Sequence, residues 1–331
     1  MTTIYEVSKL AGVSLATVSR VINKNDAVSS KTREKVLQAM QTLDYRPNSI
    51  AQSLASNRSN SIGVLVSQLD SPFFGKMMVS IEDELRNEGK QVLFAAGHNL
   101  ESVEKDSIEF LRSRLCDGLI VHCEQASDEY LHSLTTAKIP VVIINRHIPI
   151  IEDKCIVLDN VMGGFLATEY AILQGHKDIG YIAGPQDKKD AVERFNGFEQ
   201  AMAKHGIDCL PEQIVFGNYT EASGGDCLSH LLRNGFIPSI IICANDEMAS
   251  GAMKQARDLG IDIPKDLSII GYDNTSFAQY LYPQLTTINN PIGDMGKMAA
   301  RLILNQAYDQ KNTIKNRFQP HVVVRHSVSP R

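Results

Sequence analysis

The N-terminal fold is decided by residues 4–23, which read IYEVSKLAGVSLATVSRVIN. Apolar side chains at helical spacing open this stretch, namely Ile4, Val7, Leu10 and Ala11. Gly12 ends this predicted helix, and Ser14 can cap a second helix over residues 15–23. The inward side chains of the second helix are Val18, Val21 and Ile22. Two short helices around a tight turn indicate a helix-turn-helix, which presents its second helix to the major groove of DNA. Spacing alone leaves an ordinary helical hairpin as the alternative.

A third helix and a linker follow this motif. The third helix is expected to begin after Ser29 and Ser30, to bury Val36, Met40 and Leu43, and to end near Tyr45 and Arg46. Asn48 can then cap a short helix over residues 49–55, before the polar residues 56–61. Because so short a helix is marginal in water, we expect it to order only when it docks on another surface.

From Ile62 onward, short β-branched runs alternate with amphipathic helices. Strands are predicted over residues 62–66, 91–95, 118–122, 141–145, 155–158, 179–183, 240–243 and 267–272. Helices are predicted over residues such as 75–87, 163–174, 192–205 and 246–259. This alternation indicates an α/β body of two doubly wound, parallel-sheet subdomains that meet near residue 160.

The expected organisation has three parts. They are an all-α helix-turn-helix domain (residues 1–46), a hinge helix and linker (47–59), and a ligand-binding and dimerisation body (60–331). Within the body, subdomain one spans about 60–159 and 290–317, and subdomain two about 160–289 and 318–331. A chain of 331 residues suits two or three domains of ordinary size.

Charge is distributed unevenly along the chain. Residues 1–58 hold 8 Lys or Arg and 4 Asp or Glu, so they carry +4 of the net charge of −5, and the remainder carries −9. A cationic head on an anionic body suits a polyanionic partner at one end only.

Several functional classes lack their sequence signals. No apolar run reaches the length of a membrane span and no secretory signal opens the chain, so a cytoplasmic protein is expected. The six cysteines are scattered and are interpreted as reduced, mostly buried thiols. No phosphate-binding loop or dinucleotide fingerprint appears, and His98, His122, His132, His176 and His205 lack metal-ligand spacing. We therefore expect no catalysis, no cofactor and no metal.

The chain resembles the lactose and galactose repressor (LacI/GalR) family over essentially its whole length. The head carries the resemblance in VSKLAGVSLATVSRVINKNDAVSSKTREKVLQAM and LDYRPNSIAQSLA. The body carries it in SPFFGKM, VVIINRHIP, GYIAGP, ANDEMASGAM, SIIGYDN, QLTTI and VVVRHSV. The galactose branch is most similar, through DSPFFGKM, LIVHCEQASDEYL, INRHIP, CIVLDN and VVRHSVS. The resemblance implies a homodimeric repressor of a sugar-utilisation operon, with a periplasmic-binding-protein-like body. It also implies a sugar inducer, for which D-galactose is the first candidate.

The expected DNA contacts lie on the helix-turn-helix and in the linker. Arg20 can pair with guanine, whereas Leu15 and Ala16 offer only apolar contact to a base edge. Phosphate contacts are expected from Thr3, Tyr5, Ser14, Thr17, Ser19, Asn23 and Thr32, although capping or surface roles remain open for each. The resemblance implies that Leu54 of the hinge helix enters the minor groove and kinks the duplex. The remaining linker candidates are Asn48, Gln52 and Ala55.

Ligand-binding candidates follow the predicted strands, because ligands of open α/β sheets bind beyond the carboxyl ends of the strands. The candidates are Asp70, Phe73, Phe74, Asn145, Arg146, Arg194, Tyr219, Asn245, Asp273 and Asn290. Planar polar groups with an aromatic face suit a pyranose. The resemblance favours Arg194, Asn245 and Asp273 most. Asp246 precedes an apolar helix and can simply cap it.

Other functions remain open at this point. A different sugar (a β-glucoside, another hexose or a pentose) or a corepressor would fit the same architecture. A sugar-binding receptor without DNA function and a doubly wound enzyme are the alternatives from other classes.

Overall fold

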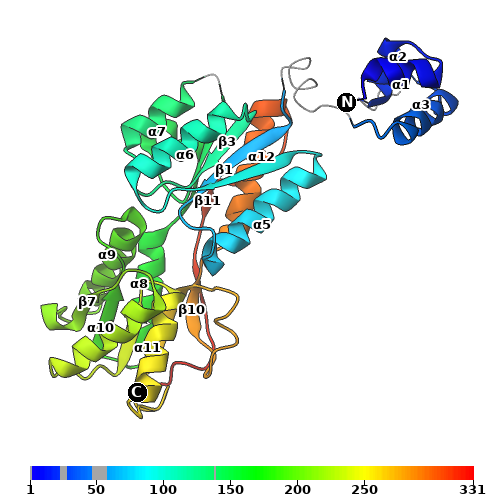
Figure 1. Ribbon diagram of the computed structural model, residues 1–331. Helices are drawn as coiled ribbons and strands as arrows, with labels where there is room; N and C mark the ends of the chain where they lie inside the picture. The colour runs from blue at the N-terminus through cyan, green and yellow to red at the C-terminus, as the bar shows by residue number, and fades with distance from the viewer. Residues whose placement is uncertain (1, 23–27, 47–57, 138) are drawn as a thin grey trace. The chain divides into compact units, whose positions relative to one another are not determined.

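The computed structural model describes residues 2–22, 28–46, 58–137 and 139–331. The chain divides into two compact units, residues 1–60, called the head, and residues 61–331, called the body (Figure 1). The expected hinge helix over residues 49–55 lies outside the described residues, and so do Asn23, Asn48, Gln52, Leu54 and Ala55.

The described part of the head contains three helices, α1 (Ile4–Ala11), α2 (Leu15–Ile22) and α3 (Ser30–Thr42). Gly12 ends α1 in the left-handed conformation, with φ of 67°, which glycine adopts without steric cost. Ser14 accepts a hydrogen bond from the Thr17 amide and caps α2 as predicted. Ser29 accepts one from the Thr32 amide and caps α3, which begins at Ser30 and not after it.

The core of the head is small and aliphatic. It consists of Val7, Val18, Val21, Val36 and Ala39, with half-buried side chains around it that include Met40 and Leu43. Leu10 shares the helical spacing of Ile4, Val7 and Ala11 but is 53% exposed, so the apolar spacing of α1 extends beyond the part of the helix that is buried.

The first sheet of the body has the order β11-β5-β4-β3-β1-β2, with every pair parallel. Its strands are β1 (Ser61–Val66), β2 (Gln91–Ala96), β3 (Gly118–Val121), β4 (Val141–Ile144), β5 (Cys155–Leu158) and β11 (Arg317–Phe318). Its helices are α5 (Pro72–Asn87), α6 (Glu101–Ser113), α7 (Asp128–Thr135), the 3-10 helix η1 (Pro149–Lys154) and α12 (Ile292–Tyr308). We call this half lobe 1.

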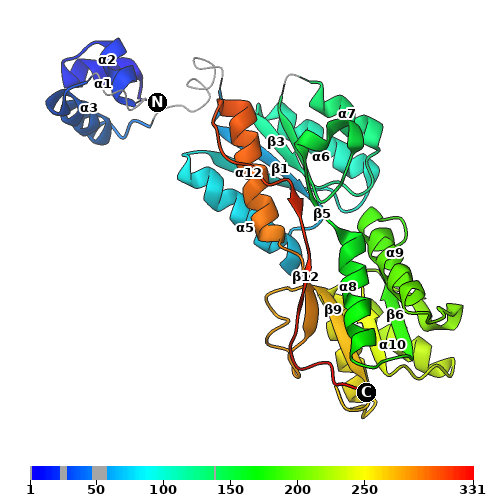
Figure 2. The same ribbon diagram turned by 180° about the vertical axis from the view of Figure 1, so that it is seen from behind.

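Lobe 1 is a three-layer unit. Alternate residues of β1 point to opposite faces, so Val64 packs with α5 and α12, whereas Leu65 packs with α6 and α7. Figure 2 shows α5 and α12 side by side on one face of the sheet. Burial on both faces explains why the inner strands β1, β3, β4 and β5 are predominantly apolar runs.

The second sheet has the order β12-β10-β9-β8-β6-β7. Its strands are β6 (Ile179–Ala183), β7 (Ile214–Phe216), β8 (Ile240–Cys243), β9 (Ser268–Asp273), β10 (Thr286–Asn289) and β12 (His321–Val323). Its helices are α8 (Asn160–Leu173), α9 (Lys189–Lys204), the 3-10 helix η2 (Pro211–Gln213), α10 (Glu221–Arg233) and α11 (Asp246–Asp258). We call this half lobe 2.

The chain passes between the lobes at three places, after β5, after β10 and after β11. On the last passage it returns from lobe 1, so β12 pairs antiparallel with β10. This edge strand departs from the expected all-parallel sheet, while the other pairs are parallel. The predicted strands over residues 155–158, 179–183 and 240–243 coincide with β5, β6 and β8. The structure adds strands, among them β7 and β10, that the sequence pattern did not mark.

Two further features of the described residues concern membrane spans and cysteines. No helix among the described residues is long and apolar enough to cross a membrane. All six cysteines are free thiols, and Cys209 alone among them is half-buried instead of buried.

Candidate functional site

A pocket lies between the lobes, where the carboxyl ends of their parallel strands meet. Lobe 1 lines it with Gln68, Ser71, Phe73, Phe74, Asn99, His122, Glu124 and Asn145. Lobe 2 lines it with Lys188, Asp190, Arg194, Asn218, Tyr219, Thr220, Asn245, Glu247 and Asp273. Its polar groups come from both lobes, so a ligand held there contacts both at once.

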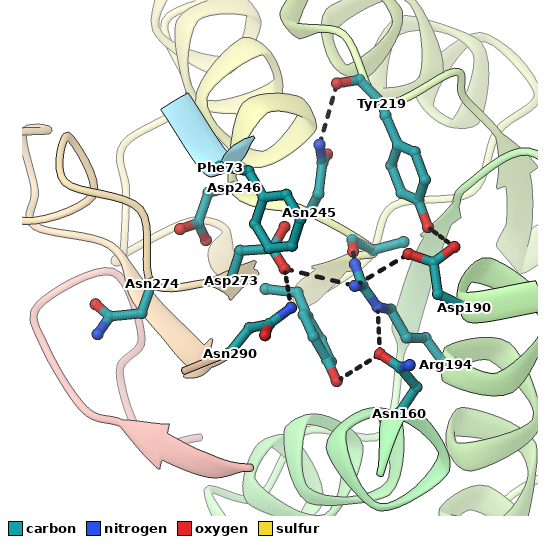
Figure 3. A network of polar contacts seen from close by, with 12 residues as sticks. Phe73, Asn160, Asp190, Arg194, Tyr219, Asn245, Asp246, Asp273, Asn274 and Asn290 are labelled. Carbon is teal, nitrogen blue, oxygen red and sulfur yellow. Dashed lines mark hydrogen bonds and ion pairs between the residues drawn. The ribbon is translucent and has the colours of Figure 1, made fainter. Parts of the chain in front are cut away.

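Arg194, in the second turn of α9, is the central charge of the pocket (Figure 3). Its side chain is 2% exposed, and its Nη2 lies 3.2 Å from Asp190 Oδ2 and 3.5 Å from Asp273 Oδ1. Burial opposes its charge, but Asp273, Tyr219 and Asp190 together outweigh burial and hold the pKa of Arg194 above its ordinary value. The guanidinium is therefore a fixed, fully ionised group that joins two carboxylates.

The rest of the Arg194 side chain is held by neutral groups. Its Nε donates to Asn160 Oδ1 at 3.2 Å, and its Nη1 donates to the Ala244 carbonyl oxygen at 2.6 Å. The guanidinium carbon lies 3.9 Å from the centroid of the Tyr272 ring, a cation–π contact. Because its neighbours hold the planar guanidinium group on several sides, its orientation toward the pocket is set before any ligand binds.

Asp273 is the last residue of β9 and is supported from behind by Asn290. Asn290 donates from Nδ2 to Asp273 Oδ1 at 3.1 Å. Burial raises the pKa of Asp273, while Arg194 acts against that rise. Asn290 is fully buried and is not among the lining residues, so it positions Asp273 in this arrangement.

Four lining residues have backbone conformations that L side chains rarely adopt. The φ angles are 56° for Asn99, 61° for Asn145, 69° for Tyr219 and 107° for Asp273. Strain of this kind costs on the order of 1–3 kcal/mol per residue and is concentrated at functional sites. In addition, Asn145 Oδ1 is buried and has no hydrogen-bond partner among the described residues. It is an acceptor that a bound ligand can satisfy.

Asn245 and Asp246 divide the roles that the sequence left open. Asn245 caps α11, because its Oδ1 accepts from the Met248 amide, and its Nδ2 donates to the Tyr219 carbonyl oxygen and to Glu247 Oε2. The interpretation of Asp246 as the cap is therefore wrong. Asp246 instead accepts hydrogen bonds from Thr275 and from the Thr287 hydroxyl, which ties α11 to the segments after β9 and in β10.

His122 and Glu124 form a buried pair on the lobe 1 side. His122 Nε2 lies 3.5 Å from Glu124 Oε1, and His122 Nδ1 lies 3.1 Å from Ser67 Oγ. Burial lowers the pKa of His122 to about 4. Burial, followed by the nearby charge of Asp190, raises the pKa of Glu124 to about 8. At neutral pH the pair is thus uncharged at the histidine and mostly protonated at the carboxyl.

Aromatic rings complete the lobe 1 wall. Phe73 and Phe74 lie in the first turn of α5 and pack edge to face, with ring centroids 5.1 Å apart. Phe74 packs in the same way against His122, at 4.9 Å. From lobe 2, the Tyr219 hydroxyl donates to Asp190 Oδ1 at 3.3 Å. The pocket therefore combines apolar ring surface with planar polar groups.

Two candidates lie elsewhere than the sequence predicted. Arg146 points back into lobe 1, where it pairs with Asp128 at 2.6 Å and donates to the carbonyl oxygens of Cys123 and Ala126. Asp70 is exposed and does not line the pocket. Both follow strands as the prediction required, but the loop conformation after each strand directs them away.

Sequence reasoning also missed several lining residues. Among them are His122, Glu124, Lys188, Asp190 and Glu247. Asp190 lies one helical turn before Arg194, a spacing that pairs side chains on one helix face and could have indicated it. Glu124 carried no such signal, because the Glu104 carboxylate that holds its backbone amide lies twenty residues earlier in the sequence.

The outer surface of the head contains the candidate DNA-contacting residues. Ala16, Ser19 and Arg20 of α2 are exposed, as is Tyr5 of α1, while Leu15 is half-buried. Thr3, Ser14, Thr17 and Thr32 all take part in local capping bonds. Their hydroxyls are thus engaged within the head, and their phosphate contacts stay a prediction.

The described residues were compared with the ligand sets that hold metal ions. Within residues 2–22, 28–46, 58–137 and 139–331, no cluster of three or more His, Cys, Asp or Glu side chains could hold a metal ion. His176, for example, bonds through its two ring nitrogens to Ser239 Oγ and the Ser329 carbonyl oxygen, which is a structural role.

The fold and the pocket define a class of protein, a DNA-binding head joined to a two-lobed ligand-binding body. Residues 3–48 match the family described as "Bacterial regulatory proteins, lacI family", and residues 168–328 match "Periplasmic binding protein-like domain". Among curated relatives, GalR of Escherichia coli K12 is 39% identical over 99% of this chain and 96% of its own length. PurR of Pasteurella multocida is 35% identical over the full length of both chains.

Solved structures agree with these sequence matches. The Lac repressor dimer bound to operator and the anti-inducer ONPF has a TM-score of 0.88 at 28% identity, covering 99% of both chains. A complex of the transcriptional regulator CelR with cellobiose has a TM-score of 0.72 at 29% identity, covering 99% of this chain and 100% of that one. The chain therefore belongs to the lacI family of bacterial regulatory proteins. It is a DNA-binding transcriptional regulator and not an enzyme.

Proposed function

We propose that this regulator represses a sugar-utilisation operon and is released from its operator by a small sugar, with D-galactose as the first candidate. The observation that carries the proposal is the buried Arg194, held between Asp190 and Asp273 at a pocket that both lobes line. The similarity to GalR over nearly the whole chain supports galactose as the first sugar to test.

The pocket offers the chemistry that a pyranose requires. Planar carboxylate, amide and guanidinium groups at Asp273, Asn145 and Arg194 can each engage neighbouring hydroxyls. The rings of Phe73 and Tyr219 can cover the C–H side of the sugar. Sugar recognition of this kind does not involve breaking a bond.

The DNA-binding role rests on the head. The exposed face of α2 presents Ala16, Ser19 and Arg20, on a segment that carries net positive charge. In the proposed complex Arg20 contacts guanine, while Leu15 and Ala16 make apolar contacts to bases. Thr3, Tyr5, Ser14, Thr17, Ser19, Asn23 and Thr32 contact phosphates. Leu54 enters the minor groove, and Asn48, Gln52 and Ala55 are the other DNA contacts of the linker.

Coupling between sugar and operator requires a difference in sugar affinity between two states of the body. A hundredfold release of operator corresponds to about 2.7 kcal/mol of coupling free energy. We propose that the chain uses residues 1–46 to read DNA, 47–59 as the hinge, and 60–331 to sense the ligand and to dimerise. Similarity to the Lac repressor dimer supports the homodimer. A role on operator DNA supports a cytoplasmic location.

Two measurements test this function together. A thermal-shift panel of sugars identifies the ligand, because a ligand at a hundred times its Kd adds about 2.7 kcal/mol of stability. A gel shift with operator DNA, with and without that sugar, then measures release. Operator binding that weakens with the sugar supports repression relieved by an inducer. If no sugar stabilised the body, sugar sensing would be wrong.

The alternatives give different results in the same experiments. Operator binding that strengthens with the ligand would identify a corepressor. A β-glucoside, another hexose or a pentose could replace galactose, and the likeness to CelR in its cellobiose complex is the specific reason to include β-glucosides. A sugar-binding receptor without DNA function would show a thermal shift and no gel shift.

A further inference from the structure

Glu104 is a buried carboxyl group that lies outside the ligand pocket. It belongs to the first turn of α6, its side chain is fully buried, and it is not among the residues that line the pocket. A carboxyl group in the interior is strongly unfavourable unless hydrogen-bond donors surround it. The donors that meet Glu104 come from residues 122–127, the segment between β3 and α7, which we call the bridging loop.

Three successive backbone amides of the bridging loop donate to Glu104. The Glu124 amide donates to Oε1 at 2.8 Å, and the Ala126 amide donates to Oε2 at 2.7 Å. The Gln125 amide between them is shared by both oxygens, at 3.2 and 3.1 Å. Both oxygens therefore act as acceptors, which is the role of a carboxylate. One side chain of α6 thus holds a backbone segment that lies about twenty residues further along the chain.

The Glu104 side chain reaches this loop through a space that Gly97 leaves open. A Cβ at Gly97 would lie 2.6 Å from Glu104 Cγ, closer than real Cβ contacts allow. Gly97 follows β2, and its amide donates to the Val66 carbonyl oxygen at the end of β1. A larger residue at this position would therefore have to displace the Glu104 side chain or the backbone after β2.

The carbonyl oxygens of the bridging loop are held by Arg146. Its Nη1 donates to the Ala126 carbonyl oxygen at 2.7 Å and to the Cys123 carbonyl oxygen at 3.4 Å. Its Nε donates at 2.9 Å to Asp128, the first residue of α7. With Glu104 on its amides and Arg146 on its carbonyls, the loop has its conformation set within lobe 1, before a ligand contacts it.

Side chains at and next to the bridging loop connect lobe 1 to lobe 2. Gln125 Nε2 donates to Asp187 Oδ2 at 2.8 Å, and Lys189 Nζ lies 2.8 Å from Asp128 Oδ2. Neither Gln125 nor Asp128 lines the pocket, although the same loop contributes two lining residues. A contact between lobes contributes fully only when its partners are already in place, because ordering a loose loop costs conformational entropy. The position of the loop backbone therefore decides how much these two connections contribute.

We propose that Glu104 is a positioning residue for sugar binding: it fixes the bridging loop so that Gln125 and Asp128 meet lobe 2 when a sugar is held between the lobes. The inference rests on the proposed sugar sensing and adds a determinant of sugar affinity that the sugar does not touch. Loss of the Glu104 carboxylate releases both connections together, although neither connecting side chain has changed.

Glu104→Gln tests the carboxylate with little change in shape. The variant replaces one acceptor oxygen by an NH2 group, which faces backbone N–H donors and cannot accept from them. Isothermal titration of D-galactose into the full-length protein measures the effect. We expect Kd to rise about five- to tenfold, the combined effect of two exposed connections.

Glu101→Gln is the matched control. Glu101 also lies in the first turn of α6, so both variants remove one negative charge from the same helix N-terminus. The Glu101 side chain is 51% exposed and pairs with Lys105 on the same helix. Its loss should leave Kd within about twofold of the unmodified value.

A double-mutant cycle distinguishes positioning from a general loss of structure. Gln125→Ala together with Lys189→Ala removes both connections and leaves Glu104 unchanged. This pair should raise Kd about five- to tenfold in the unmodified protein, but by less than about twofold in Glu104→Gln, where the connections are already lost. Effects that multiply in the combined variant would mean that Glu104 acts without the connections, and would overturn the proposal.

The same cycle can be measured on the protein without sugar. The midpoint of urea unfolding should show the same loss of effect in the Glu104→Gln background. If no sugar binds the unmodified protein, the proposed sugar sensing is wrong, and the midpoints still decide whether Glu104 controls the connections. Additive midpoint shifts would contradict that control.

Gly97→Ala provides a second variant in case Glu104→Gln does not fold. The added Cβ displaces the Glu104 side chain without changing its charge. We expect a smaller rise in Kd, about two- to fivefold, and again little further effect of removing the two connections. A Gly97→Ala variant with the Kd of the unmodified protein would show that the loop keeps its position when Glu104 moves, which also contradicts the proposal.

Discussion

Lys189 Nζ lies 2.8 Å from Asp128 Oδ2, and this ion pair joins lobe 2 to lobe 1 beside the pocket. Lys189 is the first residue of α9, and Asp128 is the first residue of α7. A second bond runs in parallel, from Gln125 Nε2 to Asp187 Oδ2 at 2.8 Å. The lobes are thus connected on the lobe 1 side through Gln125, in the loop after β3, and through Asp128, at the start of the following helix α7.

Lys189→Ala should weaken ligand binding, although Lys189 is not among the residues that line the pocket. Loss of the bond between the lobes makes the closed pocket less favourable, and exposed pairs contribute about 0.2–1 kcal/mol, so Kd should rise about two- to fivefold. Isothermal titration at low and high salt measures the effect, which should shrink as salt increases. Lys204→Ala is the control, because Lys204 is similarly exposed, 57% against 52%, and pairs with Glu169 within lobe 2. Equal effects of both variants would contradict a role for the bond between the lobes.

Arg194→Met should lower stability and abolish ligand binding together. The variant preserves side-chain volume but leaves the buried Asp190 and Asp273 without their cation, and breaking a buried pair in this way costs about 3–5 kcal/mol. Calorimetric melting measures the loss for the body. Arg257→Met, at an exposed position on α11, should melt close to the unmodified protein. A melting temperature for Arg194→Met that matched this control would show that the carboxylates are satisfied without Arg194.

The stability of the ligand-free body should fall as pH rises above neutrality. Burial raises the pKa of Glu124 from 4.5 to about 8 and that of Glu247 to about 7, so the folded state binds more protons than the unfolded state between these values. The free energy of unfolding then decreases with rising pH over that window. Burial lowers the pKa of His122 from 6.5 to about 4, which gives the opposite slope below pH 6.5.

The carboxyl contribution is therefore isolated above pH 6.5. Melting temperatures of the body measured from pH 6.5 to about 8.5 should decline, and the decline should be shallower in Glu124→Gln. Glu199→Gln should show the unmodified slope, because its carboxyl is exposed in the folded state. Parallel pH profiles for all three proteins would mean that Glu124 is ionised in the folded state at neutral pH.

Gly164→Ala should disturb the pocket through helix packing. A Cβ at Gly164 of α8 would lie 1.9 Å from the Arg194 carbonyl oxygen in α9, so the two helices must separate to accept it. We expect a loss of about 1–3 kcal/mol of stability and weaker ligand binding, because the backbone of Arg194 moves. Gly75→Ala in α5, where an added Cβ meets nothing within 4 Å, should be neutral or slightly stabilising. Unchanged ligand affinity in Gly164→Ala would show that α9 adjusts without displacing Arg194.

Arg20→Ala should reduce operator affinity at specific base pairs. Loss of a bidentate contact to guanine costs about 1–3 kcal/mol and relaxes the preference at that position. Fluorescence anisotropy on a set of operator variants measures both effects. Ser19→Ala, at a neighbouring exposed position, should weaken binding to all operator variants alike if Ser19 contacts a phosphate. If Arg20→Ala lost the same affinity for every operator variant, Arg20 would instead be a phosphate contact.

The sequence by itself determined the local features of this protein. Gly12 and Ser14 define the turn of the helix-turn-helix through backbone conformation and capping, which depend on adjacent residues only. The strands over residues 155–158, 179–183 and 240–243 were predicted at their observed bounds, because burial on both faces makes a strand a continuous apolar run. The candidates Arg194, Asn245 and Asp273 lie together in the pocket.

Only the tertiary structure decided which of two similar residues faces the pocket. Arg146 follows a predicted strand and Arg194 lies near the start of a predicted helix, yet Arg146 turns back to its own loop and Arg194 meets Asp190, Asp273 and Tyr272. Glu104 holds a loop about twenty residues away, and Lys189 meets Asp128 in the other lobe. Periodicity and capping are set within a few residues, whereas these contacts depend on long-range packing between elements, so no local pattern encodes them.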